Sequence, residues 1–113
     1  MNGTERKAAI AAYREREIAT GVFALRFAGE ARVWVGGAKE IAGTENRLRF
    51  SLRGGAYPRP ALQRAWNAWG EAAFAFEILE LLELEEDVTD FVRSARLASR
   101  LTHWREALAA EPI

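Results

Sequence analysis

Cysteine is missing from this 113-residue chain, and histidine, methionine and proline are scarce. Without cysteine there is no disulfide framework, no thiol nucleophile and no cysteine-ligated zinc site. No apolar run reaches the roughly 18–20 residues that a helix needs to cross a bilayer. The charged start, Met-Asn-Gly-Thr-Glu-Arg-Lys, also lacks the apolar core of a secretory signal. These absences predict a cytoplasmic protein that does not contact a membrane.

Apolar residues, by contrast, are plentiful: 50% of the chain is hydrophobic and 11% is aromatic. A chain of this length buries about two thirds of the surface that it exposes when unfolded, and its composition differs from that of a disordered segment. We therefore predict a single compact domain. Residues 1–19 are expected to form an N-terminal helical extension, and residues 20–109 the main folded part.

A net charge of zero conceals a segregation of charge along the chain. Residues 26–70 carry eight basic and three acidic side chains, whereas residues 71–90 carry eight acidic side chains and no basic one. A basic segment can form a surface that contacts phosphates even in a neutral protein. The alternative is an ordinary solvated surface on which charges cluster. The bases are mostly arginine, which suits bidentate phosphate contacts.

Alternating apolar residues predict three strands. Residues 21–27 and 32–36 alternate and flank a turn sequence at 28–31, which is typical of a β-hairpin. A third strand is expected over residues 74–82. In that strand Glu77 and Glu80 have odd spacing, so we expect them on opposite faces and not as a paired-carboxylate site.

Helical spacing and capping residues predict four helices, over residues 5–18, 44–53, 60–69 and 87–109. Thr44 and Asp87 are the expected N-caps of two of them. Trp66 and Trp69 are expected to pack beneath the sheet, and Phe91 to point inward from the last helix. Three polar residues of the third helix are expected to face outward or cap its turn: Gln63, Arg64 and Asn67.

This order of elements, with one hairpin, predicts an α+β fold: a small three-stranded, mainly antiparallel sheet flanked by helices. Two short segments and one longer unit then resemble the GIY-YIG nuclease superfamily. Gly21-Val22-Phe23 is followed by Trp34-Val35-Gly36, and residues 62–80 resemble the family's helix that leads into its third strand. The resemblance runs from about residue 20 to 108 and is greatest to short, single-domain bacterial members. It implies that the two motifs lie on adjacent strands.

The resemblance also implies candidate catalytic positions. The two family tyrosines are replaced by Phe23 and Trp34, which are either core aromatics or a stacking surface for bases. The helix-borne arginine of the family is matched by Arg47, with Arg49 as the alternative. A histidine or tyrosine of the following loop is matched by Tyr57. Neither replacement for the tyrosines can act as a base near neutral pH.

Further candidates concern nucleic acid and metal. Nucleic-acid contacts are expected from Arg47, Arg49, Arg53, Arg59 and Asn67, the last matching a family asparagine. The family's metal-binding glutamate precedes a helix tryptophan, but the residues just before the corresponding tryptophan here contain no carboxylate. The metal ligands thus stay unknown; magnesium or manganese is expected if the protein is active, and otherwise no cofactor.

Three functions follow from these features. The leading one is nucleic-acid binding, to DNA more than RNA, on a nuclease scaffold whose cleavage is weak or lost. The second is a working divalent-metal endonuclease with a rearranged set of ligands. The third is a protein-interaction module that no longer binds nucleic acid.

Overall fold

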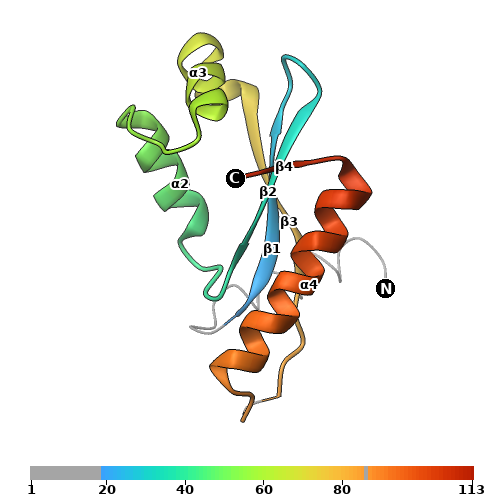
Figure 1. The fold of residues 1–113 in the computed structure, drawn as a ribbon. Helices are drawn as coiled ribbons and strands as arrows, with labels where there is room; N and C mark the ends of the chain where they lie inside the picture. The colour runs from blue at the N-terminus through green and yellow to red at the C-terminus, as the bar shows by residue number, and fades with distance from the viewer. Residues whose placement is uncertain (1–18, 86) are drawn as a thin grey trace, which may run out of the picture.

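The computed structural model describes residues 19–85 and 87–113, so the helix predicted over residues 5–18 lies outside the described part. Within that part, three α-helices flank a four-stranded mixed sheet (Figure 1). The strand order is β3-β1-β2-β4. The elements are β1 (Gly21–Phe27), β2 (Arg32–Ala38), α2 (Thr44–Arg53), α3 (Pro60–Trp69), the 3-10 helix η1 (Glu71–Ala73), β3 (Phe74–Leu81), α4 (Asp90–Leu108) and β4 (Glu111–Pro112).

The predicted hairpin and third strand are confirmed. β1 pairs antiparallel with β2 on one side and with β3 on the other, so the two motif segments lie on adjacent strands. β2 extends two residues beyond its predicted end, to Ala38. The fourth strand was not predicted, because β4 has two residues and no periodicity of its own; it pairs parallel with β2.

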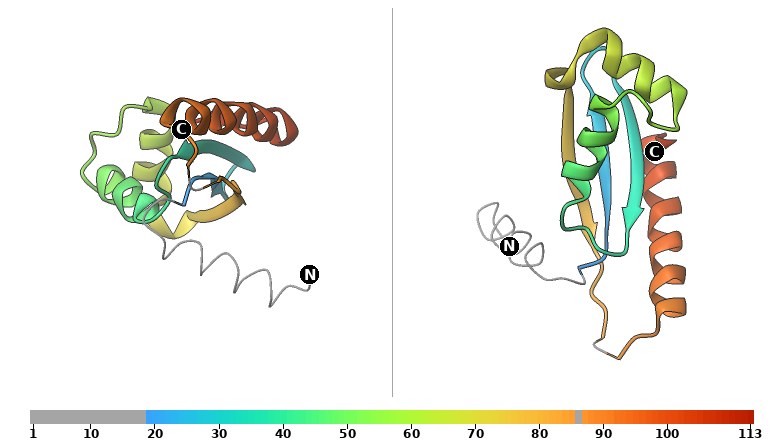
Figure 2. Two further views of the ribbon diagram at one scale, coloured as in Figure 1. Left: turned by 90° about the horizontal axis from the view of Figure 1, so that it is seen from below. Right: turned by 90° about the vertical axis from the view of Figure 1, so that its left-hand side faces the viewer.

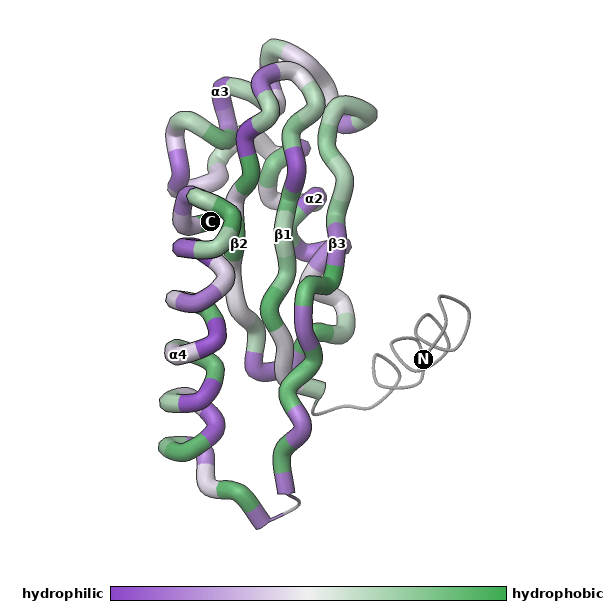
Figure 3. Tube along the Cα trace, turned by 90° about the vertical axis from the view of Figure 1, so that its right-hand side faces the viewer, coloured by the Kyte–Doolittle hydropathy of each residue, from purple (hydrophilic) through white to green (hydrophobic). Residues whose placement is uncertain are grey.

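Helices cover the sheet from both sides. α2 and α3 lie on one face and α4 on the other, alongside β2 (Figures 2 and 3). The face toward α4 buries the small cluster Val22, Ala24 and Val35, against which Leu97, Leu101, Trp104 and Leu108 pack. None of the helices in the described part combines the length and hydropathy that crossing a bilayer requires.

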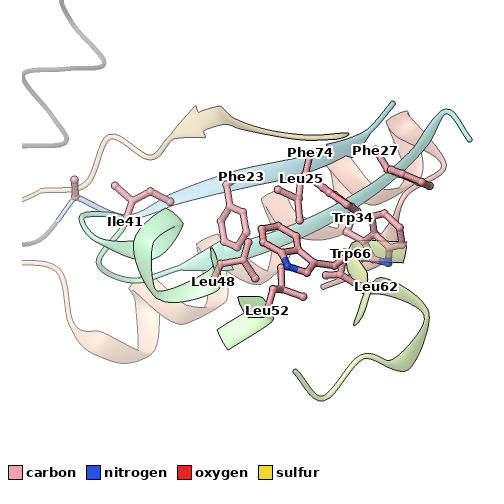
Figure 4. Close-up of a cluster of buried hydrophobic side chains, with 11 residues drawn as sticks. Phe23, Leu25, Phe27, Trp34, Ile41, Leu48, Leu52, Leu62, Trp66 and Phe74 are labelled. Atoms are coloured by element: carbon pink, nitrogen blue, oxygen red, sulfur yellow. The ribbon is translucent and has the colours of Figure 1, made fainter. Parts of the chain in front are cut away.

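The larger core lies between the sheet and the α2–α3 pair (Figure 4). Aromatic rings from the strands, including Phe27 and Phe74 stacked at 4.9 Å, meet leucines from the two helices. Leu62 and Trp66, one helical turn apart on α3, are both buried, as the apolar spacing predicted. The helix then ends at Gly70, whose φ of 83° lies in the left-handed region that glycine adopts readily.

The prediction that Glu77 and Glu80 point to opposite faces is wrong. The pairing register between β1 and β3 shifts at Val22, so one extra residue of β3 stands between the two ladders. Glu77 is therefore opposite Ala24 and Glu80 opposite Val22, both on the face toward α4. A bulge of this kind inverts the alternation beyond it, and sequence spacing alone does not reveal it.

The predicted N-caps are wrong, by one residue for α2 and by two for α4. Gly43 is the N-cap of α2, and Thr44 is instead its first residue, whose hydroxyl donates to the Glu40 carbonyl. α4 begins at Asp90 with Thr89 as its N-cap, and the Thr89 hydroxyl oxygen accepts from the Val92 amide. Several residues near each helix start are chemically able to cap, so composition does not select among them.

Two aromatic side chains predicted to be buried are exposed. Trp69 is 58% exposed because the last turn of α3 lies beside the β1–β2 turn at Gly29, where its ring meets Phe27 edge-on, with 5.6 Å between the ring centres. Phe91 is 82% exposed in the first turn of α4, which extends past the end of β2 (Figure 1). In both helices the apolar stripe continues beyond the sheet that it would need to cover.

Candidate nucleic-acid interface

The two motif aromatics are core residues. Phe23 and Trp34 are 5% and 1% exposed, and both belong to the larger cluster (Figure 4). The Phe23 ring stacks on Phe76 at 5.2 Å, and the Trp34 ring lies 6.4 Å from those of Phe27 and Phe74. Neither ring has a free face on which a nucleobase could stack, and neither side chain can accept a proton near neutral pH.

Both motif glycines permit close approaches. A Cβ atom at Gly21 would lie 2.7 Å from the backbone oxygen of Glu80, and one at Gly36 would collide with Ile113 and lie 2.8 Å from Cζ of Phe23. Any larger residue would push these strands or side chains apart. Glycine at these two positions is thus explained by packing.

The segment of residues 111–113 covers the second motif. β4 pairs with Trp34 and Val35, and Ile113 packs into the larger core beside Gly36. The Glu111 carboxylate accepts two hydrogen bonds from Arg32, at 2.9 and 2.7 Å, and this guanidinium lies 4.7 Å from the Trp34 ring centre. Sequence reasoning missed this segment, because its contacts are with residues about 79 positions away.

Arg49 and Arg53 are engaged within the fold. Both donate to Glu71, Arg53 at 2.8 and 2.7 Å and Arg49 at 3.4 Å. Arg49 also donates to Glu45 at 3.0 Å and to the Phe74 carbonyl at 3.3 Å. Their guanidinium groups hold α2 to η1 and β3, so Glu71 and Glu45 neutralise much of the charge that the sequence placed at the centre of a phosphate-contacting surface.

This network has a predicted pH dependence. Hydrogen bonding to Arg53 is the main cause that holds the pKa of Glu71 below its ordinary value of 4.5. A lowered folded-state pKa stabilises the protein above the unfolded-state pKa, and that contribution is lost as the pH falls through the folded value. We expect the wild type to be more stable than Glu71→Gln at pH 7, and the difference to shrink below about pH 4.5. Urea titrations at several pH values measure it.

Glu83→Gln is the matched control for this titration, because Glu83 is exposed and forms no ion pair with any described residue. Its stability should track the wild type from neutral to acidic pH. A Glu71→Gln variant that stays as stable as the wild type at pH 7 contradicts the assigned role of this network.

A buried glutamine organises the loop between α2 and α3. Gln63 donates from Nε2 to the Leu52 carbonyl at 3.0 Å and to Oδ1 of Asn67 at 2.9 Å, and its Oε1 accepts from the Tyr57 amide at 3.1 Å. Of the two expected arrangements, facing outward is wrong for Gln63: it is buried, and it is a second donor, beside the Gly55 amide, to the Leu52 carbonyl at the end of α2. Asn67 remains exposed, and Tyr57 is half-buried.

Most bases of the 26–70 segment form ion pairs with acids elsewhere. Besides Arg49 and Arg53, the pairs are Arg26–Glu77, Arg32–Glu111 and Lys39–Asp90, at 2.7 to 2.9 Å. In the fold the acidic segment lies against the basic one. The opposite charges that are separated along the sequence therefore neutralise one another in the structure. Among the described residues, three arginines of this segment form no ion pair with a carboxylate: Arg47, Arg59 and Arg64.

Of these three, Arg47 and Arg59 are candidate site residues from the sequence. Arg47 is exposed at the start of α2, and among the described residues it donates only long hydrogen bonds, to the Ala42 carbonyl at 3.4 Å and the Thr44 hydroxyl at 3.3 Å. Arg59 is exposed and donates from Nε to the Ile113 carbonyl at 3.3 Å. Among the described residues Arg47 has no carboxylate partner, so an anion can approach its positive charge.

Arg105 is a further arginine that sequence reasoning missed. It projects from α4 and donates from Nε and Nη2 to the Val35 carbonyl, at 3.1 and 3.0 Å. Burial, and then the nearby charge of Arg59, lower the pKa of Arg105. The neighbouring residues in the sequence do not indicate this role, because the Val35 carbonyl that Arg105 contacts is 70 residues away.

A metal site would need several ligand side chains close together. Over residues 19–85 and 87–113, no three histidine, cysteine or carboxylate side chains gather so that they could hold an ion. Glu77 and Glu80 do lie on one face, but each already accepts hydrogen bonds. Glu77 accepts from Arg26, and Glu80 accepts from Arg100 and Trp104. The described residues therefore form no multi-ligand cluster for the divalent ion that the family resemblance implies.

Comparison with solved structures identifies the scaffold. The catalytic domain of the homing endonuclease I-TevI matches with a TM-score of 0.64 and 26% identity, over 80% of this chain and 88% of that one. A mutant form of the same catalytic domain matches with a TM-score of 0.66 and 24% identity, over 80% and 84%. This chain accordingly has a GIY-YIG-like nuclease fold. No protein-family model and no curated protein sequence matches it.

Proposed function

We propose that this protein binds nucleic acid, DNA in preference to RNA, on a GIY-YIG-like nuclease scaffold, and that its cleavage activity is weak or lost. The observation that carries the proposal is the state of the two motif positions. The scaffold is that of an endonuclease catalytic domain, yet Phe23 and Trp34 are buried in its core.

The chemistry of phosphodiester hydrolysis explains why these positions matter. The attacking water needs a base, and the charge that develops on the phosphoryl oxygens needs a metal ion or guanidinium. A phenyl ring accepts no proton and an indole only donates a hydrogen bond. Among the described residues no carboxylate cluster supplies a metal. Arginines that bind phosphate without a base give affinity without turnover.

The binding half of the proposal rests on the uncompensated arginines. Among the described residues Arg47 has only a carbonyl and a hydroxyl as partners, and both Arg47 and Arg59 stand in exposed positions. A guanidinium group stays charged at any physiological pH and presents paired donors to phosphate oxygens. Because each neutralised phosphate releases counterions, such binding weakens steeply as salt rises.

A protein-interaction module is the second candidate function, because three large apolar side chains are exposed on separate helices: Phe50, Trp69 and Phe91. Isolated exposed apolar residues are common on monomeric proteins, so this observation favours the alternative less. A working endonuclease would need magnesium or manganese, bound by fewer than three side chains or by residues outside the described part, because the described residues form no larger cluster of ligands.

The proposal predicts binding without efficient cleavage. Labelled single- and double-stranded oligonucleotides should bind at low salt and dissociate as salt rises, and they should stay intact with magnesium or manganese present. Arg47→Ala should weaken binding by about tenfold if it removes one charged contact. Fluorescence anisotropy measures the affinity, and denaturing gels measure cleavage.

Two results would contradict this proposal. An absence of binding to either oligonucleotide at low salt would favour the protein-interaction module. Rapid metal-dependent cleavage that co-purifies with the protein, and that disappears in Arg47→Ala, would favour the endonuclease. Glu83→Ala is the surface control for both assays, since Glu83 is exposed and forms no ion pair with any described residue.

A further inference from the structure

A hollow lies between α3 and the β1–β2 turn, at the hairpin end of the sheet (Figure 2). Its volume is about 240 Å³, and its walls include the side chains of Trp69, Arg64 and Glu30. The other α3 side chains on its wall are alanines, which leave the space open. Sites that enclose a drug-sized ligand occupy roughly 300–1,000 Å³, so this hollow suits one small planar group.

Trp69 gives this hollow an aromatic wall that is both open to solvent and held in place. The residue is 58% exposed, whereas Phe27, whose ring meets the indole edge-on at 75°, is 2% exposed. Gly29 of the turn also approaches closely, since a Cβ there would lie 3.1 Å from Cε2 of Trp69 and 2.5 Å from Cζ of Phe27. An aromatic ring that is already held loses little conformational freedom when a ligand stacks on it.

Arg64 supplies a positive charge on the same wall. It is exposed, and with the described residues it forms neither an ion pair nor a hydrogen bond. Arg32 also lines the hollow, but it donates to Glu111 at 2.9 and 2.7 Å and lies 3.7 Å from Glu30. Of the two arginines, Arg64 is therefore the one whose guanidinium is left for an anion. A single exposed ring is common on proteins, so the hollow and this arginine together carry the inference.

We propose that this hollow binds one unpaired nucleobase of a single-stranded nucleic acid, which stacks on Trp69 while Arg64 contacts the adjacent backbone phosphate. The inference rests on the proposed function for its ligand and adds the strandedness. A base inside a duplex is already stacked on both faces, so an indole can receive only an unpaired base.

The third polar group of the hollow fits the same ligand. The Glu30 carboxylate repels a phosphate from the hollow itself, but it can accept a hydrogen bond from an exocyclic amino group, as carboxylates do from N4 of cytosine. An apolar segment of a protein partner would also cover Trp69, but it would bring no anion to Arg64. A nucleotide has both the planar ring and the anion, and it is therefore the occupant that the side chains favour.

Affinity and salt dependence test the two contacts separately. The probe is a labelled single-stranded deoxycytidine oligonucleotide, titrated by fluorescence anisotropy at four salt concentrations. Trp69→Ala should weaken its binding by about 5- to 150-fold, the loss of one stacked base, and should leave the slope of log K against log salt unchanged. Arg64→Gln should reduce the magnitude of that slope by about 0.7, the value for one phosphate of a single strand. If neither variant differs from the wild type, the proposed site is wrong.

Phe91→Ala and Arg96→Gln are the matched controls. They remove an exposed ring and an exposed arginine from α4, and Arg96 forms no ion pair with any described residue. Both should bind the single strand within twofold of the wild type and with the same slope. Trp69→Phe keeps a ring against Phe27, so it guards against misfolding and should retain most of the affinity.

A duplex whose ends are closed by glycol linkers tests the selection for an unpaired base. It offers no such base, so Trp69→Ala should bind it as tightly as the wild type does. An equal loss of affinity for the closed duplex and the single strand would overturn the proposed stacking. Circular dichroism verifies the folding of every variant.

A mononucleotide separates failure of this site from failure of the proposed function. Deoxycytidine monophosphate should shift the NMR signal of the Trp69 indole N–H, which is assigned by its loss in Trp69→Phe, and deoxyribose phosphate should not. Such a shift without binding of any oligonucleotide would keep the base site and overturn the nucleic-acid function. Oligonucleotide binding that leaves this signal unmoved would keep the function and overturn the site, with a protein partner then favoured as the occupant of the hollow.

Discussion

Replacing Trp66 with alanine should lower the free energy of unfolding by about 3–5 kcal/mol, as for other large core aromatics. Trp66 is 6% exposed, and its ring lies 5.3 Å from that of Phe74, in the cluster that joins α3 to the sheet. Small domains have about 5–15 kcal/mol in total, so this one truncation removes a large share. Urea denaturation followed by circular dichroism measures the change.

Arg64→Ala, two residues earlier on the exposed side of the same helix, is the control. It should change the free energy of unfolding by no more than about 0.5 kcal/mol. If Trp66→Ala proves as mild as Arg64→Ala, α3 does not pack as described. The best-matched segment of the family resemblance would then lose its structural basis.

Restoring the family tyrosine at the first motif, Phe23→Tyr, should destabilise this protein. Cζ is the Phe23 ring atom nearest to the position of a Cβ at Gly36, so a hydroxyl added at Cζ would press on that packed strand and on Ile113. Inserting an atom into a filled core costs about 1–3 kcal/mol, and a buried hydroxyl without a partner adds to that cost. Urea titration measures the loss, and the cleavage assay should show no gain.

Phe91→Tyr makes the same chemical change at an 82% exposed ring and should be close to neutral. A Phe23→Tyr variant that is as stable as the wild type and cleaves DNA would show that the motif position is still organised for catalysis. That result would contradict the loss of cleavage that we propose.

Local patterns were enough to predict most elements of this fold. Alternation and turn residues predicted β1 and the start of β2 to the residue, and helical spacing predicted α2 and α3 with the bounds observed. Leu62 and Trp66 were placed in the core because a period of 3.6 residues puts them on one face. These features depend on neighbours in the chain, which is why sequence alone specifies them.

The candidate site depended on contacts that no local pattern contains. Whether an arginine meets a carboxylate or remains available to an anion is decided by which segments the fold brings together: Arg53 meets Glu71 across 18 residues, whereas Arg105 meets the Val35 carbonyl across 70. The sequence by itself therefore determined strands β1 to β3, helices α2 to α4 and the GIY-YIG-like class of this protein. Tertiary structure alone decided which charges are neutralised and that Phe23 and Trp34 are sealed in the core, because Coulomb interaction and burial depend on distance in space.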